Sequence, residues 1–417
     1  MGPGSLLKHI TVILPIAYRG GSLRVAKTIA RMIKKGSAEA DDNCGVRLAV
    51  IQGKYDLQSD FRDLHEDEIE VREFEWERIE QQKAENIAFI QGQRADLYAA
   101  EYQIPVDGIN NLIDSDLWFI VSDRLELPLA PVKPFVVFAT DYIQRYVPEI
   151  FPRDGWGTVD MPFLTAARMA KAVVVTTPQT RMDAISYAGV PASKVHLAPM
   201  DFDPTWMPEA LKEDLEDDQP YFVWPTNPTQ HKNHIRAFEA LAAYYRKFDG
   251  KLNVRVTGAN THWLNPLQKI ERWIAEIDHI AETRKLVSRS SVFKDRVRFM
   301  GELSDDLYAQ MLANAEFLWH PTIYDNGTFA VAEAAWYGCP SLSSGYPQMR
   351  YIGERFSIPM EFFSARSVDE MARALKAMEE KTPALRKGLP DRESLSQHSW
   401  EHHAFEYWGL LKGIAAQ

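Results

Sequence analysis

The stretch that decides the fold is YDNGTFAVAEAAWYGCP, residues 324–340. It places two carboxylates, Asp325 and Glu333, eight positions apart around a short polar turn. The apolar run 317–319 before it is typical of a buried strand, and the alanine-rich part after Thr328 is typical of a helix. The order strand, loop, helix is therefore predicted.

A helix that begins near Thr328 would direct free backbone amides and the positive end of its dipole at the loop, which favours a phosphate there. Carboxylates accept hydrogen bonds from sugar hydroxyls. A phosphate site beside hydroxyl acceptors describes a site for a nucleotide sugar. Spacing alone supports equally an ordinary amphipathic helix with a solvated acid. Residues 341–347 predict a second strand and turn, hence a βαβ unit, which favours the ligand site.

The same stretch resembles the E-x7-E region of retaining glycosyltransferases of the GT-B fold, family 4 (group 1). Asp325 stands at the first Glu position, Glu333 at the second, and the turn 338–340 follows. The resemblance implies that Asp325 holds hydroxyls of the transferred sugar and Glu333 those of the ribose. It also implies a donor-binding role for the loop and helix start: Asn326, Gly327, Thr328 and Phe329. Asp is one methylene shorter than Glu, so we expect an altered contact to the hexose.

Length and composition predict a soluble two-domain protein. The chain has 417 residues, of which 46% are hydrophobic and 25% charged, too many for one core. Its net charge of −11 argues against nucleic acid as a partner. With two cysteines and no apolar run near the ~20 residues that cross a bilayer, we expect a cytoplasmic location.

Predicted strands alternate with helical segments, which indicates an α/β class with a mainly parallel sheet. The strands expected are 9–15, 46–52, 117–121, 135–139, 172–176, 221–224, 253–258, 296–301, 317–320 and 341–344. The helices expected are 23–35, 234–248, 266–287, 305–314 and 400–414. The acid-rich stretch 56–80 is expected to form helix and loop. Residues 199–220, rich in Pro, Asp and Glu, are expected to link two domains.

The resemblance implies two Rossmann-like domains that face each other across a cleft. Residues 6–203 would form the acceptor-binding domain and residues 204–395 the domain that binds the nucleotide sugar. Residues 396–417 would form a helix that crosses back to the first domain.

The loop after the strand 221–224 is expected to supply a cation. Lys232 suits a diphosphate leaving group as a flexible point charge, although a plain surface lysine is the alternative. The family usually carries an Arg near the start of this loop, where this chain has Thr226 or Asn227. We assign both to donor binding, together with Met300, because relatives read the base through the backbone at that strand end. His231 and Arg236 are weaker candidates for the second cation.

Two further candidates lie in the first half. Gly20 and Gly21 resemble the glycine-rich loop of the family, where a backbone approaches the donor phosphate closely. They do not form G-x-G-x-x-G, which disfavours a nicotinamide or flavin cofactor. Asp141 follows the strand 135–139 where many relatives carry His-Asp, so it becomes the polar candidate there. A structural capping role for Asp141 is the alternative.

The segment Arg24–Lys35 interleaves apolar and basic residues at helical spacing. It is expected to be a core-packed helix with a solvated face. A patch facing anionic lipid, and so peripheral contact with the inner face of a membrane, is the alternative.

By resemblance, the function expected is a retaining hexosyltransferase of surface-polysaccharide or lipopolysaccharide biosynthesis. The donor would be a nucleoside-diphosphate sugar, with GDP-mannose as our expectation, and the acceptor a glycan or lipid-linked glycan. No Asp-x-Asp follows a strand and no His/Asp cluster has metal spacing, so we expect metal-independent transfer. The alternatives are a catalytically silent GT-B glycan-binding or scaffold subunit, and a GT-B epimerase or phosphorylase.

Overall fold

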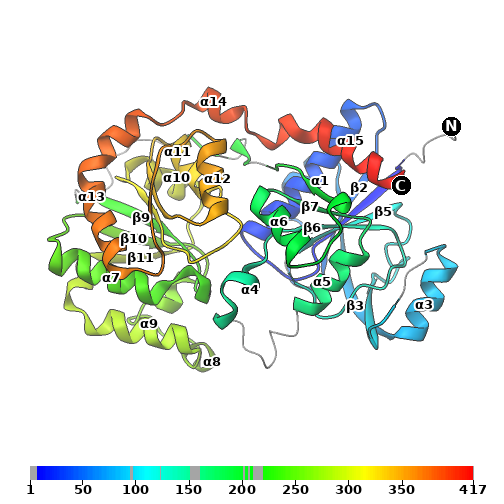
Figure 1. Ribbon diagram of the computed structural model, residues 1–417, viewed down its shortest axis with the longest axis horizontal. Coiled ribbons are helices and arrows are strands. Elements are labelled where there is room, and N and C mark those ends of the chain that lie inside the picture. Colours follow the sequence, from blue (N-terminus) through cyan, green and yellow to red (C-terminus); the bar gives the residue numbers. More distant parts are fainter. Residues whose placement is uncertain are drawn as a thin grey trace. The chain divides into compact units, whose positions relative to one another are not determined.

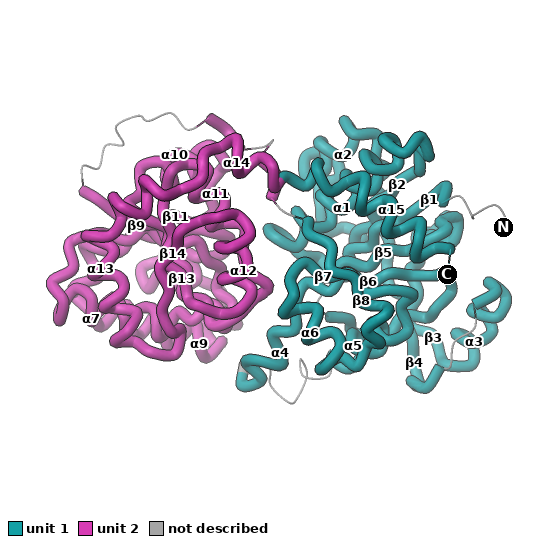
Figure 2. Tube along the Cα trace, turned by 45° about the horizontal axis from the view of Figure 1, so that its top comes forward, with its two compact units in different colours: residues 1–201, 399–417 teal, residues 202–398 magenta. Residues whose placement is uncertain are grey.

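The computed structural model describes residues 7–93, 97–122, 124–150, 160–200, 202–204, 207–209 and 219–416. The chain divides into two compact units (Figure 2), unit 1 with residues 1–201 and 399–417 and unit 2 with residues 202–398. Most of the predicted linker 199–220 lies outside the described residues. The acceptor and donor roles of the two units stay predictions.

Unit 1 is built on an eight-stranded sheet with the order β4-β3-β2-β1-β5-β6-β7-β8. The strands are β1 (His9–Ile13), β2 (Gly45–Ile51), β3 (Glu70–Glu80), β4 (Glu101–Val106), β5 (Leu117–Ser122), β6 (Phe135–Ala139), β7 (Ala172–Val175) and β8 (Val195–Leu197). All neighbouring strands are parallel except β3 and β4. The strand order reverses between β1 and β5, which makes this the switch point of the sheet.

Apolar runs explain the centre of this sheet. Every residue of β5, β6 and β7 is buried, as expected for parallel strands covered by helices on both faces. The helices are α1 (Gly21–Glu39), α2 (Arg62–Glu66), α3 (Gln81–Ile90), α4 (Ile143–Tyr146), α5 (Asp160–Met169), α6 (Pro178–Ser186) and α15 (Ala404–Ala415). Figure 1 shows α15, from the far end of the chain, lying against α1.

Unit 2 holds a six-stranded, fully parallel sheet with the order β11-β10-β9-β12-β13-β14. The strands are β9 (Tyr221–Pro225), β10 (Asn253–Thr257), β11 (Val297–Gly301), β12 (Leu318–His320), β13 (Ser341–Ser344) and β14 (Met360–Phe363). This is the doubly wound Rossmann order, and its switch point lies between β9 and β12.

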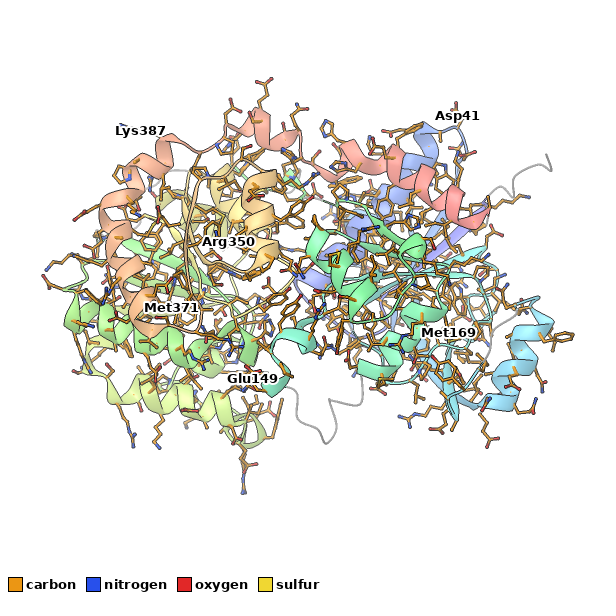
Figure 3. All side chains as sticks on the ribbon, viewed as in Figure 1. Asp41, Glu149, Met169, Arg350, Met371 and Lys387 are labelled. Carbon is orange, nitrogen blue, oxygen red and sulfur yellow. The ribbon has the colours of Figure 1, made fainter. Side chains whose placement is uncertain are left out.

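Helices cover both faces of the second sheet (Figure 1). They are α7 (His234–Lys247), α8 (Arg272–Ala275), α9 (Asp278–Arg289), α10 (Asp305–Asn314), α11 (Ala330–Trp336), α12 (Pro347–Arg355), α13 (Val368–Lys387) and α14 (Arg392–Ser396). α7, α9 and α13 pack one apolar core against the strands, with Met371 of α13 fully buried in it (Figure 3).

Local signals set the bounds of α13. The Ser367 hydroxyl accepts a hydrogen bond from the Glu370 amide at 3.2 Å, and acids occupy the first turn. Arg386 and Lys387 occupy the last turn. Acids near the amino end and cations near the carboxyl end both favour the helix dipole.

The α/β class with two Rossmann-like sheets is confirmed, but two local predictions were wrong. Residues 70–80 form β3, the second strand from the sheet edge, whose charged residues are offset by ion pairs such as Arg72 with Asp107 at 2.9 Å. The predicted helix 266–287 is divided into α8 and α9, and the Arg284 guanidinium binds carbonyls of the loop before α8, including Asn265 O at 2.6 Å. The helix of the opening stretch begins at Ala330, close to the expected start near Thr328.

Two general features follow from the described residues. None of the helices that can be described is both long and apolar enough to cross a membrane. Cys44 and Cys339 are both buried free thiols.

Candidate functional site

The candidate site of unit 2 lies at the carboxyl ends of β9 and β12. These strands pair directly, with Leu318 beside Val223, and they flank the switch point of the sheet. The loop 226–233 follows β9 and the loop 321–329 follows β12. Ligands of open α/β sheets bind at this place, so both loops predicted to carry the site meet where such a site belongs.

Backbone and side-chain hydrogen bonds join the two loops. The Ile323 amide donates to His231 O at 2.8 Å. The side chain of Asn233, which is 4% exposed, donates to Pro321 O at 3.0 Å and to Ala365 O at 2.8 Å. Asn233 has a φ of 67°, a left-handed conformation that Asn tolerates better than most residues. The loops therefore form one hydrogen-bonded platform.

Lys232 and Asp325 form an ion pair on this platform. The Lys232 ammonium donates to Asp325 Oδ2 at 2.9 Å, and the two side chains are 16% and 11% exposed. The other carboxylate oxygen, Oδ1, accepts from the Tyr346 hydroxyl at 2.5 Å and from the Gly327 amide at 2.8 Å. Burial raises the pKa of Asp325, but the nearby charges, Lys232 first, and the hydrogen bonds from Tyr346 and Lys232 together outweigh burial and hold that pKa well below its ordinary range.

A neutral histidine lies behind the ion pair. His320 Nε2 is 3.8 Å from Asp325 Oδ2 and 3.1 Å from the Thr322 hydroxyl. Its Nδ1 is 3.4 Å from the hydroxyl of Ser343. Burial lowers the pKa of His320 to about 4, against the pull of the Asp325 carboxylate. At neutral pH the local charges are therefore one ammonium and one carboxylate.

Thr226 and Asn227 have structural partners of their own. The Thr226 amide donates to Thr257 O at 2.8 Å, and its hydroxyl is 3.0 Å from His234 Nε2. Asn227 Oδ1 accepts from the Thr229 amide at 3.2 Å and so closes the turn. A Cβ on Gly258, whose φ is +124°, would lie 2.0 Å from Thr226 O. Only glycine lets these two loops approach so closely.

Met300 lies at the end of β11, two strands from β9 in the sheet order, with a side chain that is 38% exposed. Gly301 beside it accepts from the Gly258 amide and from the Thr257 hydroxyl, both at 2.8 Å. A row of backbone contacts thus connects the ends of β9, β10 and β11. The base-reading role of Met300 stays a prediction.

The remaining donor candidates lie at the start of α11. The Gly327 amide is bound to Asp325, and the Thr328 hydroxyl accepts from the Ala330 amide at 3.2 Å. Phe329 packs its ring 6.1 Å from Phe356. Glu333 is half-buried in the first turn of α11. Asn326 is half-buried in the turn before Gly327, whose φ is +84°.

Gly20, Gly21 and Asp141 belong to unit 1. Gly20 caps α1 with a φ of 69°, and an added Cβ at either glycine would meet open space. Asp141 follows β6, and its Oδ1 accepts from the Ile143 amide at 3.2 Å, which fits the capping alternative. All three lie at the carboxyl edge of the first sheet, after β1 and β6. Their meeting with the residues of unit 2 stays a prediction.

Acids offset the basic face of α1. The Lys27 ammonium pairs with Asp63 at 2.6 Å and Arg31 with Asp67 at 2.6 Å. Lys34 lies 3.7 Å from Glu68. The acid-rich segment beside the helix therefore neutralises much of the charge that a lipid-facing patch would need.

Two residues of the site, Tyr346 and His320, were not predicted from the sequence. Both lie in segments predicted to form strands and turns, and no local pattern links them to Asp325. Tyr346 follows β13 and His320 ends β12, neighbouring parallel strands. Polar residues at adjacent strand ends were the signal that could have found them. No group of three or more His, Cys, Asp or Glu in the described part of the chain is arranged to hold a metal ion.

Two doubly wound units, one with a polar cluster at its switch point, define the class of protein: the chain has the GT-B fold that the sequence predicted. No protein-family model and no curated protein matches the sequence. Solved structures of glycosyltransferases and related enzymes match this chain over nearly its whole length.

HepE of Anabaena, in complex with UDP and glucose, is 15% identical with a TM-score of 0.64, over 98% of this chain and 100% of that chain. Sucrose-phosphate synthase from Thermosynechococcus elongatus is 14% identical with a TM-score of 0.63, over 98% and 99%. WaaG, a glycosyltransferase involved in lipopolysaccharide biosynthesis, is 16% identical with a TM-score of 0.54, over 98% of both. At these identities the likeness establishes the fold.

Proposed function

We propose that the protein is a glycosyltransferase that takes a hexosyl unit from a nucleoside-diphosphate sugar. One observation carries the proposal: Lys232 and Asp325 form an ion pair at the switch point of unit 2, and Glu333 lies in the first turn of the helix that follows the same loop. Support comes from the whole-length likeness to HepE, which was solved with UDP-glucose as well as with UDP and glucose.

Lys232 is suited to act as the cation that offsets the charge of a leaving diphosphate. Its ammonium has three N–H donors, and Asp325 takes one of them at 2.9 Å. The side chain remains 16% exposed, so solvent and ligands reach it. Because the ammonium is already held in place, ordering it costs little free energy when it stabilises the charge that develops in the transition state.

Transfer with retention and without a metal is part of the proposal. The leaving phosphate can take the proton of the acceptor hydroxyl on the same face of the sugar, so no separate base is required. Lys232 supplies a cation without a metal. In this proposal Glu333 accepts from ribose hydroxyls, which suits a half-buried carboxylate.

The identities of the donor and the acceptor are a separate part of the proposal. GDP-mannose was our expectation from the sequence, whereas the structure of HepE contains UDP-glucose. A glycan or lipid-linked glycan acceptor, surface-polysaccharide synthesis and a cytoplasmic site of action complete the proposal. The likeness to WaaG supports that context. Membrane contact through Arg24–Lys35 has less support, because Lys27 and Arg31 are paired with acids.

A catalytically silent glycan-binding subunit is the second candidate, favoured by one observation. Both oxygens of Asp325 already accept hydrogen bonds within the protein, so the residue expected to bind the sugar is largely occupied.

Calorimetric titration with UDP, GDP and dTDP and their hexose esters tests the proposal, followed by transfer and hydrolysis assays with each binder. We expect one nucleotide family to bind and to turn over. Glu333→Gln should weaken nucleotide binding at least about tenfold, or ~1.4 kcal/mol. Exposed Glu282 on α9 provides the matched control Glu282→Gln, which should bind normally.

Two results would count against the proposal. Binding without turnover of any donor supports the silent subunit. Normal binding and transfer by Glu333→Gln would show that the donor site is elsewhere.

A further inference from the structure

We infer that Asp325 acts in this protein as the positioning residue for Lys232 rather than as a ligand of the transferred sugar. The inference rests on the proposed function for its catalytic meaning, and on the hydrogen bonds around Asp325 for its geometry. It reverses the role that the resemblance implies for the first acid of the stretch.

The carboxylate of Asp325 is occupied on both oxygens. A carboxylate offers about four lone-pair positions. Oδ1 accepts from the Tyr346 hydroxyl at 2.5 Å and the Gly327 amide at 2.8 Å, and Oδ2 accepts from Lys232 at 2.9 Å. The whole residue is 8% exposed. Three of these positions are taken, so a sugar hydroxyl would have to reach the remaining one on Oδ2 of a buried residue, or displace a donor and leave it unpaired, which is costly in a buried place.

Tyr346 fixes the direction of the carboxylate. It is 6% exposed, and its ring packs 5.6 Å from Tyr324 and 6.3 Å from His320. Burial, and then the charge of Asp325, raise the pKa of Tyr346 well above its ordinary value. The hydroxyl therefore stays protonated and donates to Oδ1, which turns Oδ2 toward the loop that carries Lys232.

The shorter side chain fits this role. Asp keeps its carboxylate close to the backbone, within reach of the Gly327 amide two residues along. The φ of Gly327 is +84°, and a Cβ there would lie 2.4 Å from Ile352 Cδ1. A glycine turn thus brings an N–H onto the carboxylate. Two donors hold Oδ1, and the ion pair is made by Oδ2.

The ion pair with Asp325 orients the Lys232 ammonium but cancels its net charge. The ammonium and carboxylate sum to zero, so the pair adds little positive potential to the site. A free lysine would lose side-chain entropy on becoming ordered. Asp325 has already imposed that order, and two N–H donors of Lys232 remain for an anion.

The first test compares nucleotides with nucleotide sugars, using UDP against UDP-glucose and GDP against GDP-mannose. If Asp325 acts through Lys232, Asp325→Asn changes the Kd of the nucleotide and of its sugar ester by the same factor, within about twofold. Tyr346→Phe should keep the same ratio and lower kcat less than Asp325→Asn does. Exposed Asp295 provides the charge control Asp295→Asn. A Kd change confined to the sugar ester would overturn the inference.

The second test needs no ligand. Lys232→Met leaves a buried carboxylate without its cation, which is strongly destabilising. The double variant Lys232→Met/Asp325→Asn removes that charge, so its Tm should lie above that of Lys232→Met. Equal Tm values would show that Asp325 does not depend on Lys232, and would also overturn the inference.

The two tests separate the inference from the proposed function. If the wild type binds none of the nucleotides, the proposed function fails while the Tm comparison still decides whether Asp325 holds Lys232. If nucleotides bind and Asp325→Asn affects only the sugar esters, the proposed function stands and the inference fails.

Discussion

At the residue scale, the site depends on which polar groups stay charged after burial. Asp325 remains ionised because the Lys232 charge and the hydrogen bonds to the carboxylate together outweigh the cost of burial. His320, 3.8 Å from the same carboxylate, does not become charged, because burial outweighs that attraction. His234, hydrogen-bonded to Thr226, is likewise fully buried and neutral, with its pKa lowered by burial to about 3.

The two histidines predict an acid-sensitive fold. In the unfolded chain they take up protons below about pH 6.5, but in the folded protein only near their pKa values of about 4 and 3. Between these limits the unfolded state binds more protons, so the free energy of unfolding falls as pH falls through this window. His320 contributes on the order of 3 kcal/mol and His234 on the order of 5 kcal/mol.

Urea unfolding from pH 8 to pH 4.5 measures this dependence. His320→Asn should remove its share, so the profile of the variant is flatter below pH 6.5. Above pH 7 both histidines are neutral in both states, and the two profiles should run parallel. A slope below pH 6.5 that is identical in wild type and variant would contradict the assignment.

At the scale of elements, the strands and helices were mostly predictable and the loops were not. The segments 135–139 and 341–344 form β6 and β13 with the predicted bounds. β3 was missed because most of its residues are charged, as on a solvated helix or loop, and only pairing with β2 and β4 makes it a strand. The join between the loops after β9 and β12 depends on Asn233, whose partners are 88 and 132 positions away.

Asn233 tests this join. Asn233→Gly removes the hydrogen bonds to Pro321 O and Ala365 O but still accepts the left-handed backbone, and should cost about 1–3 kcal/mol of unfolding free energy. Asn233→Ala also strains the backbone and should cost about 1 kcal/mol more. Urea unfolding separates the two contributions. Equal losses in the Gly and Ala variants would mean that the backbone at this position carries no strain.

At the scale of the whole molecule, the last segment of the chain belongs to the first unit. Trp408 Nε1 and the Lys412 ammonium donate to Asp42 Oδ2 at 2.6 Å and 2.8 Å. A Cβ on Gly36 of α1 would lie 2.0 Å from Ala404 O, so the two helices touch through their backbones. The large buried side chains of this segment are Trp400, Tyr407, Trp408, Leu411 and Ile414.

Gly36→Val should weaken this helix contact by about 1–3 kcal/mol, because the extra atoms have no room. Limited proteolysis should then release the segment after His398 faster than from the wild type. Gly413→Ala is the matched control, since Gly413 lies exposed on α15 with open space around it. It should be neutral or stabilising by up to about 1 kcal/mol. Unchanged proteolysis of Gly36→Val would contradict the close contact.

The sequence by itself determined the α/β class, most strands, and the two loops that carry Lys232 and Asp325, because apolar periodicity and turn residues are local signals. Only the tertiary structure decided what these two residues do to each other. They are 93 positions apart, and no local pattern could show that a parallel sheet brings them to 2.9 Å or that Tyr346 joins them from β13. Burial then fixes the charges, since desolvation depends on what surrounds a group in space.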